Sequence, residues 1–325
     1  MCFNSKEYLF LFMPVKNIVI TLFCICLFCA RTTAQLYSND YELFTTRDGL
    51  PHNNVLSAIQ DSYGFLWVGT YNGLSVYDGN GFRNLKAFEH QDDNWLYAIE
   101  TIYEDWKGNI WIGTRGGLVS CFLRKEQKFF EYKAKPIQAK IKCFHMDREG
   151  SLWIGYESGL IGVAAGDSIS TKKIVERVIY GIRGNGSDSL FILSEIGMYI
   201  YDAIAGTVYP LRKDRYQNIV DIDKSKSRTI VMSGDGFSIL DSNGRINSVQ
   251  TKIIQGNRSA VYSKVAMSAK GYYYYTDGLD IYKYDSLFRI VEKYAISDNV
   301  TYNENNILNV FIEDRSGILW LGTAS

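Results

Sequence analysis

The sequence is poor in the residues on which several classes of protein depend. Its 325 residues include only 4 prolines and 3 histidines, and 35 basic side chains balance 35 acidic ones. The lack of a basic excess argues against nucleic acid as a partner, because phosphate binding needs surplus positive charge. The histidines His52, His90 and His145 leave little room for histidine-dependent chemistry.

Cysteine is scarce outside the first 34 residues. Four of the six cysteines fall within that segment, and only Cys121 and Cys143 lie beyond it. Two cysteines do not make a disulfide scaffold, so they either pair with each other or lie buried as small apolar side chains. No CxxC motif and no Cys/His ligand set remains, so we expect no zinc site, no other metal and no cofactor.

One apolar run, Ile18–Ala30, lies near the N-terminus. A basic residue precedes it, and the small residues of Thr32–Ala34 follow it, which is the pattern of a secretory signal. The run is shorter than the ~20 residues of a spanning helix, although a retained anchor is the alternative. We predict a signal peptide over 1–34, translated from Met1 or Met13, and a periplasmic location for the rest.

The remaining composition favours strands joined by tight turns. Hydrophobic residues make up 46% of the chain, and there are 24 tyrosines and 28 glycines. Tyrosine favours strands and glycine favours turns, and the apolar content is enough for a large core. After residue 35 no apolar pattern with a helical period extends over the length of a helix.

A repeat organises the chain. The string D-x-x-G-x-[LI]-W-[VIL]-G-[TY] occurs four times, and three less similar copies fill the gap between the third and the fourth. The repeats recur about every 42 residues, which is the size of a propeller blade. Their centres, by the tryptophan or its substitute, are Trp67, Trp111, Trp153, Phe191, Ile230, Tyr272 and Trp320.

Each repeat reads as four short strands. In the first, strands are expected over 55–60, 65–69, 74–77 and 82–88, separated by Asp- and Gly-rich turns. We therefore predict an all-β, seven-bladed β-propeller over 35–325, with the tryptophans packed between blades. The last blade is incomplete, which we interpret as truncation. Tyr41–Thr46 is expected to supply an outer strand to it and to close the ring.

The segment that begins GLPHNNVLSAIQDSYGFLWVGTYNGLSVYDG resembles the two-component regulator propeller repeat. The chain looks like the N-terminal periplasmic sensor region of a Bacteroidetes hybrid two-component system. The resemblance implies a propeller that senses glycans, often oligosaccharides, with a second propeller, a membrane helix and a histidine kinase further along. It also implies a homodimer partner. Kinase motifs are absent from this chain, so we expect no enzymatic activity and a sensor truncated before its membrane and kinase regions.

A ligand is expected on the blade face that carries the turns between second and third strands. The turns between first and second strands match regular turn chemistry and are read as structural. The other face differs between copies and mixes polar with aromatic side chains, which suits sugar recognition. The ligand-binding candidates are Tyr71, Asn72, Trp95, Arg115, Tyr156, Glu157, Glu195 and Asp235.

Two other functions stay open at this point. A propeller lyase or hydrolase would need paired carboxylates or a metal near the axis, and no catalytic residue can be assigned. A protein-interaction platform is the second alternative, because propellers often serve that role.

Overall fold

A computed structural model describes residues 41–89, 95–132, 137–165, 168–184, 188–212, 219–225, 228–233, 236–240, 246–248, 264–268, 270–276, 280–295 and 308–324. The predicted signal peptide over 1–34 lies outside these residues. The chain divides into two units, Met1–Glu42 and Leu43–Ser325, and every described strand belongs to the second. Among the described residues, no helix is long and apolar enough to cross a membrane.

The described strands form seven antiparallel sheets, which we number in chain order. Sheet 1 consists of β1 (Val55–Gln60), β2 (Leu66–Thr70), β3 (Gly73–Tyr77) and β4 (Phe82–Leu85). Sheet 2 consists of β5 (Ile99–Glu104), β6 (Ile110–Thr114), β7 (Val119–Leu123) and β8 (Lys128–Glu131). Sheet 3 consists of β9 (Ile141–Met146), β10 (Leu152–Tyr156), β11 (Leu160–Ala165) and β12 (Ser168–Lys173). Two short 3-10 helices, η1 (Thr46–Asp48) and η2 (Trp95–Tyr97), precede sheets 1 and 2.

Sheets 4 to 7 follow the same plan. Sheet 4 consists of β13 (Ile179–Gly184), β14 (Ser189–Ser194), β15 (Gly197–Asp202) and β16 (Thr207–Arg212), and sheet 5 of β17 (Ile219–Ser225), β18 (Arg228–Ser233), β19 (Gly236–Leu240) and β20 (Ile246–Ser248). Sheet 6 consists of β21 (Lys264–Met267), β22 (Tyr273–Thr276), β23 (Asp280–Tyr284) and β24 (Ile290–Ala295). Sheet 7 consists of β25 (Leu308–Glu313) and β26 (Leu319–Thr323). Six sheets thus have four described strands and the seventh has two.

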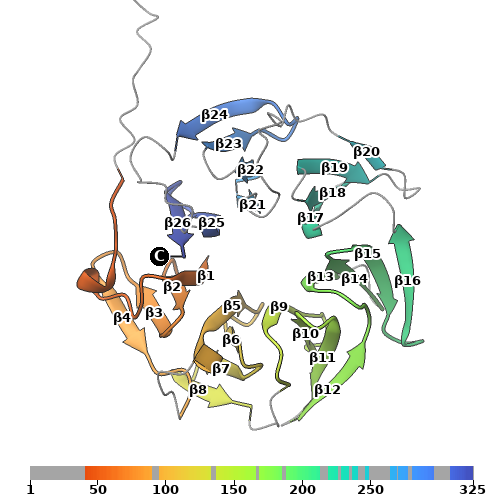
Figure 1. Ribbon diagram of the computed structural model, residues 1–325, viewed down its shortest axis with the longest axis horizontal. Helices are drawn as coiled ribbons and strands as arrows, with labels where there is room; N and C mark the ends of the chain where they lie inside the picture. The colour runs from red at the N-terminus through yellow and green to blue at the C-terminus, as the bar shows by residue number, and fades with distance from the viewer. Residues whose placement is uncertain are drawn as a thin grey trace, which may run out of the picture. The chain divides into compact units, whose positions relative to one another are not determined.

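The sheets of the second unit stand around a central opening with their first strands innermost (Figure 1). Each first strand contacts the first strand of the next sheet, and β25 contacts β1. The all-β propeller with four-stranded blades is therefore confirmed.

An aspartate fixes the turn between the first two strands in the four clearest repeats, and it is buried in three of them and half-buried in the fourth. In sheet 2, Asp105 Oδ1 accepts the backbone N–H groups of Lys107 and Asn109, at 2.8 and 2.9 Å. Its Oδ2 accepts the Trp111 indole N–H at 2.9 Å. The same indole bond joins Asp61 to Trp67, Asp147 to Trp153 and Asp314 to Trp320, at 2.8 to 2.9 Å. One carboxylate thus holds the turn and orients the tryptophan.

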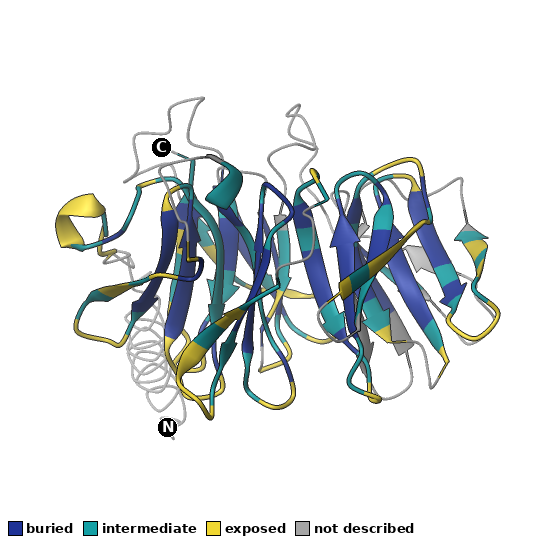
Figure 2. Cartoon of the chain, turned by 90° about the horizontal axis from the view of Figure 1, so that it is seen from below, coloured by how far each residue is buried: buried dark blue, intermediate teal, exposed yellow. Residues whose placement is uncertain are grey.

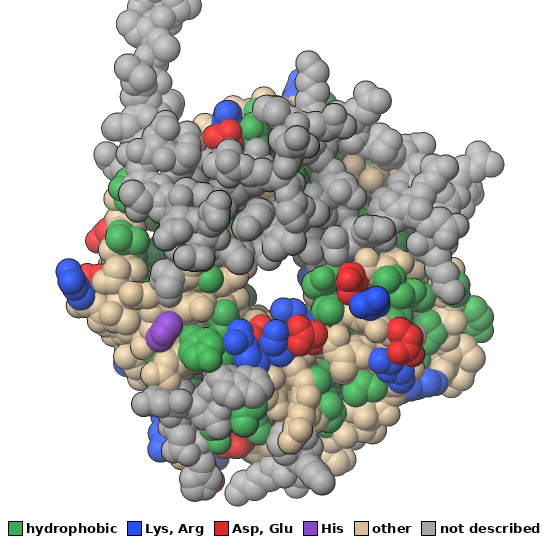
Figure 3. Space-filling view, in the orientation of Figure 1, with side chains coloured by type: hydrophobic (Ala, Val, Ile, Leu, Met, Phe, Trp, Pro, Cys, Tyr) green, Lys and Arg blue, Asp and Glu red, His purple; other side chains and the backbone are tan. Residues whose placement is uncertain are grey.

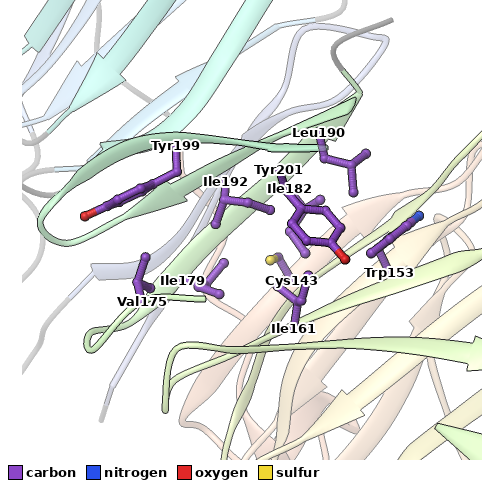
Figure 4. Close-up of a cluster of buried hydrophobic side chains, with 10 residues drawn as sticks. All are labelled: Cys143, Trp153, Ile161, Val175, Ile179, Ile182, Leu190, Ile192, Tyr199 and Tyr201. Carbon is purple, nitrogen blue, oxygen red and sulfur yellow. The ribbon is translucent and has the colours of Figure 1, made fainter. Parts of the chain in front are cut away.

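The tryptophans pack between neighbouring sheets, as predicted. Trp67 lies in one cluster with Ile99 and Ile112 of sheet 2. Figure 4 shows the equivalent cluster between sheets 3 and 4, where the Trp153 and Tyr201 rings lie 5.6 Å apart. Such interfaces bury aromatic area that a single sheet cannot bury by itself.

A glycine two residues after each of these tryptophans lets the next first strand approach. A Cβ on Gly69 would lie 2.6 Å from the Ile99 side chain, and one on Gly322 would lie 2.7 Å from Val55. The contact between the seventh and the first sheet is thus of the same kind as the contact between the first and the second sheet. Asn309 Nδ2 also donates to the Val55 carbonyl at 3.0 Å, and the Arg315 amide donates to Gln60 Oε1 at 2.9 Å.

Two sequence-based predictions are wrong in detail. Tyr41–Thr46 forms no strand, because Asp48 accepts the Thr45 amide at 2.7 Å and the chain turns into η1. Phe44 instead stacks on Trp320, with ring centroids 6.0 Å apart. In sheet 6 the tryptophan position belongs to Tyr274, not to Tyr272: Tyr273 pairs with Tyr284 as Leu66 pairs with Tyr77. Because this repeat has no tryptophan, its alignment with the other repeats was shifted by two residues in the sequence-based prediction.

The two cysteines beyond the N-terminal segment are buried in different clusters. Cys121 packs between sheets 2 and 3, whereas Cys143 packs between sheets 3 and 4. No disulfide joins them. They serve as small apolar side chains, which was one of the two alternatives.

We predict that Asp105→Ala lowers the free energy of unfolding by about 3 kcal/mol, because it leaves buried N–H donors without an acceptor. Urea denaturation followed by tryptophan fluorescence measures the change. Lys107→Ala in the same turn is the matched control and should change stability by less than about 0.5 kcal/mol. Equal effects of the two substitutions would contradict the role given to the carboxylate.

Candidate functional site: a charged rim around the central opening

A β-bulge recurs at the second residue of the first strand. In six of the seven sheets the pairing with the second strand skips this residue. A bulge leaves its residue out of the ladder and changes the direction of the side chain. The skipped residues are Leu56, Glu100, Lys142, Tyr180, Val220 and Asn309.

The turn between second and third strands lies beside this bulge. In sheets 1 to 4 the first turn residue donates its backbone N–H to the residue just before the first strand, at 2.9 to 3.1 Å. The donors are Tyr71, Arg115, Glu157 and Glu195. These four predicted residues therefore hold equivalent places at one end of four successive sheets.

Ion pairs connect bulge residues to turn residues. Arg115 Nε lies 2.6 Å from Glu100 Oε1, and Lys142 Nζ lies 3.6 Å from Glu100 Oε2. The Glu100 side chain is only 8% exposed. Beside them, Lys140 Nζ lies 3.1 Å from Glu157 Oε1. We call the set of Tyr71, Glu100, Arg115, Lys140, Lys142, Glu157, Tyr180 and Glu195 the charged rim.

Aromatic groups flank these charges. The Arg115 guanidinium lies over the Tyr71 ring, 5.3 Å from its centroid, and the His52 ring lies 5.6 Å from the same centroid. His52 Nδ1 accepts the Asn54 N–H at 2.9 Å, which fixes the imidazole. On the other side, burial raises the pKa of Tyr180, and the nearby carboxylates of Glu195 and Glu157 raise it further. Tyr180 therefore keeps its proton and can donate a hydrogen bond.

The rim contains as many basic as acidic groups, and ion pairs already position most of them. Figure 3 shows basic and acidic side chains gathered at the edge of the central opening, over β5, β9 and β13. Pre-positioned charged groups form strong hydrogen bonds to hydroxyl groups, and an exposed ring offers a stacking surface. Among the described residues, no cluster of His, Cys, Asp and Glu is suited to hold a metal ion.

Not every predicted candidate lies on the rim. Asn72 is exposed in the turn after Tyr71. Tyr156 is fully buried in the core between sheets 2 and 3, because it ends β10 inside the sheet instead of beginning the turn. It therefore does not reach a ligand on this face. Trp95 begins η2, but its side chain lies outside the described part of the structure, as does Asp235.

Four rim residues, Glu100, Lys140, Lys142 and Tyr180, were missed by the sequence analysis. Three of them are bulge residues, and a bulge leaves no clear pattern in a single sequence. Alignment of the repeats would have placed Glu100, Lys142 and Tyr180 at one position, 11 residues before the strand tryptophan or its substitute, where charge and size vary.

We predict that Glu100→Gln lowers the free energy of unfolding by about 2 kcal/mol, because it leaves two partly buried cations without their counter-charge. Urea denaturation measures this. The matched control is Glu157→Gln, which breaks an exposed pair and should cost about 0–1 kcal/mol. A Glu100→Gln variant as stable as the natural chain would show that the pair does not hold the rim in place.

Comparison with known proteins supplies the last observations. The sequence model of the family described as "Two component regulator propeller" matches residues 49–72, which include β1 and β2. No curated protein matches the sequence. The family resemblance predicted from the repeat is therefore confirmed by a model of that same repeat.

Solved structures share the fold at low sequence identity. The extracellular domains of proteins described as hybrid two component systems BT3049 and BT4673 of B. thetaiotaomicron match with TM-scores of 0.66 and 0.63 and identities of 18% and 15%. The matches cover 87% and 88% of this chain but 40% and 38% of those chains. A catalytically inactive virginiamycin B lyase from Staphylococcus aureus, with quinupristin, matches at 0.65 and 12% identity, over 87% of this chain and 95% of that one.

Proposed function

We propose that this chain, which carries the two component regulator propeller repeat, is the extracytoplasmic ligand-sensing part of a two-component signal transduction system. The ligand that we propose is an oligosaccharide bound at the charged rim. The observation that carries the proposal is the rim itself: charged groups around Glu100 are held in place by ion pairs and lie beside the half-buried ring of Tyr71.

The rim suits a neutral or weakly charged polyhydroxylated ligand. Its basic and acidic groups balance, so it has no net preference for an anion. Vicinal hydroxyl groups can bond to a guanidinium and a carboxylate at once, while the apolar side of a sugar stacks on tyrosine. Tyr71, Asn72, Arg115, Glu157 and Glu195 are our proposed binding residues, together with Glu100, Lys142 and Tyr180.

The proposal treats the seven sheets as the blades of one closed ring. Gly322 against Val55 repeats the contact that Gly69 makes with Ile99, which supports closure at the seam. A closed ring fixes the spacing of the rim residues because no blade can move without breaking two interfaces. Ligand binding would then be transmitted as a rigid-body signal to a partner region, such as a second propeller or a second copy of the chain.

The extracytoplasmic location rests on the apolar run Ile18–Ala30 and on the similarity to extracellular domains. We propose that the chain has no catalytic activity of its own. A lyase is the second candidate, because the lyase match extends over 95% of that enzyme. The two functions differ in whether a bound ligand is recovered intact.

Isothermal titration calorimetry against a panel of neutral and acidic oligosaccharides tests the proposal. We expect one class to bind, and Arg115→Ala and Tyr71→Ala to weaken it at least about tenfold, or about 1.4 kcal/mol each. Arg83→Ala, an exposed change on β4 away from the rim, is the matched control and should bind as the natural chain does.

Two outcomes count against the proposal. Binding of no member of the panel, or unchanged affinity in both rim variants, would remove the rim as the site. Recovery of shortened or rearranged ligand after incubation would favour the lyase.

A further inference from the structure

The face opposite the charged rim carries a continuous row of turns. They join first to second strands in sheets 7, 1, 2 and 3, and we call residues 314–318, 61–65, 105–109 and 147–151 the turn arc. Neighbouring turns touch: Arg315 Nη1 donates to the Ser62 carbonyl at 2.8 Å, and a Cβ on Gly108 would lie 4.0 Å from the Tyr63 ring. A Cβ on Gly150 would likewise lie 3.9 Å from Lys107 Nζ.

Large apolar side chains project from this arc into water. Trp106 is 64% exposed, Tyr63 67% and Ile318 55%, and Phe65 is also exposed. On the opposite face, Ile196 is the one large apolar side chain that the described turns expose. A concentration of exposed apolar groups on one face marks an interaction surface.

The fold does not require these side chains. The aspartates Asp61, Asp105 and Asp314 hold the turns through their own carboxylates, so the residues between Asp and Gly are free to vary. Sheet 3 has Arg148 and Glu149 at the places where sheet 2 has Trp106 and Lys107. Aromatic residues in these positions therefore add nothing to the core.

Basic groups stand among the apolar ones. Lys107, Arg148 and Arg315 are exposed on the arc, against one exposed acidic residue, Glu149. Lys107 Nζ lies 4.8 Å from the Trp106 ring centroid, and the Arg124 guanidinium lies 4.6 Å from that of Tyr63. Two acidic groups are held close by: the Glu104 carboxylate accepts the Ser62 amide at 2.8 Å, and Asp61 pairs with Arg124 at 2.6 Å, which leaves Lys107, Arg148 and Arg315 as the exposed cations of the arc.

We propose that the turn arc binds the surface of an anionic phospholipid bilayer. Tryptophan and tyrosine favour the membrane–water interface, and basic residues favour anionic headgroups. The apolar groups sit on the tips of separate turns, and exposed turns form one edge of the ring in Figure 2. Apolar tips on sheets 7, 1 and 2, continued by Arg148 on sheet 3, fit a broad flat surface better than a single small ligand. In this orientation the charged rim faces away from the bilayer.

Quenching of Trp106 by lipid tests the proposal in the whole chain. The apolar run Ile18–Ala30 can attach to lipid by itself, so vesicle attachment alone is not informative. Vesicles with brominated acyl chains quench an indole that reaches them. The signal of the natural chain minus that of Trp106→Phe isolates this tryptophan, because the other five tryptophans are common to both chains.

We expect Trp106 to be quenched on vesicles of phosphatidylcholine with phosphatidylglycerol, and weakly on phosphatidylcholine alone. The Lys107→Gln/Arg148→Gln variant should shift half-maximal quenching to higher lipid concentration by about fivefold for each charge. Ile196→Ser, on the opposite face, is the matched control and should leave quenching unchanged. Neither basic residue takes part in the seam between sheets 7 and 1, so the variant should fold like the natural chain.

The proposal fails if Trp106 stays unquenched while the chain is attached to anionic vesicles. It fails equally if quenching does not depend on phosphatidylglycerol or on the two basic residues. Protection of Trp106 from an aqueous quencher by a soluble acidic oligosaccharide, without lipid quenching, would assign the arc to a glycan. Oligosaccharide binding at the rim is measured separately, so failure here leaves the sensor proposal standing.

Discussion

The hydrogen bond from a strand tryptophan to a turn aspartate is the interaction on which this structure depends. A single buried carboxylate accepts two or more backbone N–H groups of a turn and the indole N–H six residues later. The turn is fixed because its backbone N–H groups have an acceptor in the carboxylate, and the indole is fixed because its N–H has the same acceptor. The ring plane then presses against the next sheet, where the following glycine leaves room for the neighbouring first strand.

This constraint separates the parts of the sequence that hold the ring from the parts that can vary. In the four clearest repeats, the aspartate, the glycine and the tryptophan are all needed at the interface between sheets. Side chains at the two ends of the sheets are left free, and they have diverged in different ways. One end carries the ion-paired rim around Glu100, and the other carries the aromatic and basic turn arc around Trp106. The two ends of the sheets are therefore chemically distinct.

The sequence predicted the fold well wherever the tryptophan survives. The strand over 55–60 has the predicted bounds, and the Asp-x-x-Gly turns and the glycine contacts are in place. The prediction failed at Thr45 and Asp48, where a local hydrogen bond forms in place of strand pairing. It also failed at Tyr274, where another residue replaces the tryptophan that marks the repeat. The site was harder, because a bulge at Glu100 and a buried end of strand at Tyr156 depend on pairing between strands, which a single sequence does not record.

A double-mutant cycle on Asp105 and Trp111 tests the central interaction most directly. The free energies of unfolding of Asp105→Ala, Trp111→Phe and the double variant are compared with that of the natural chain. If the carboxylate and the indole act as one unit, the two losses are not additive, and the coupling energy is about 1–3 kcal/mol. Losses that add within about 0.5 kcal/mol would show that turn and tryptophan stabilise the ring independently, contrary to this account.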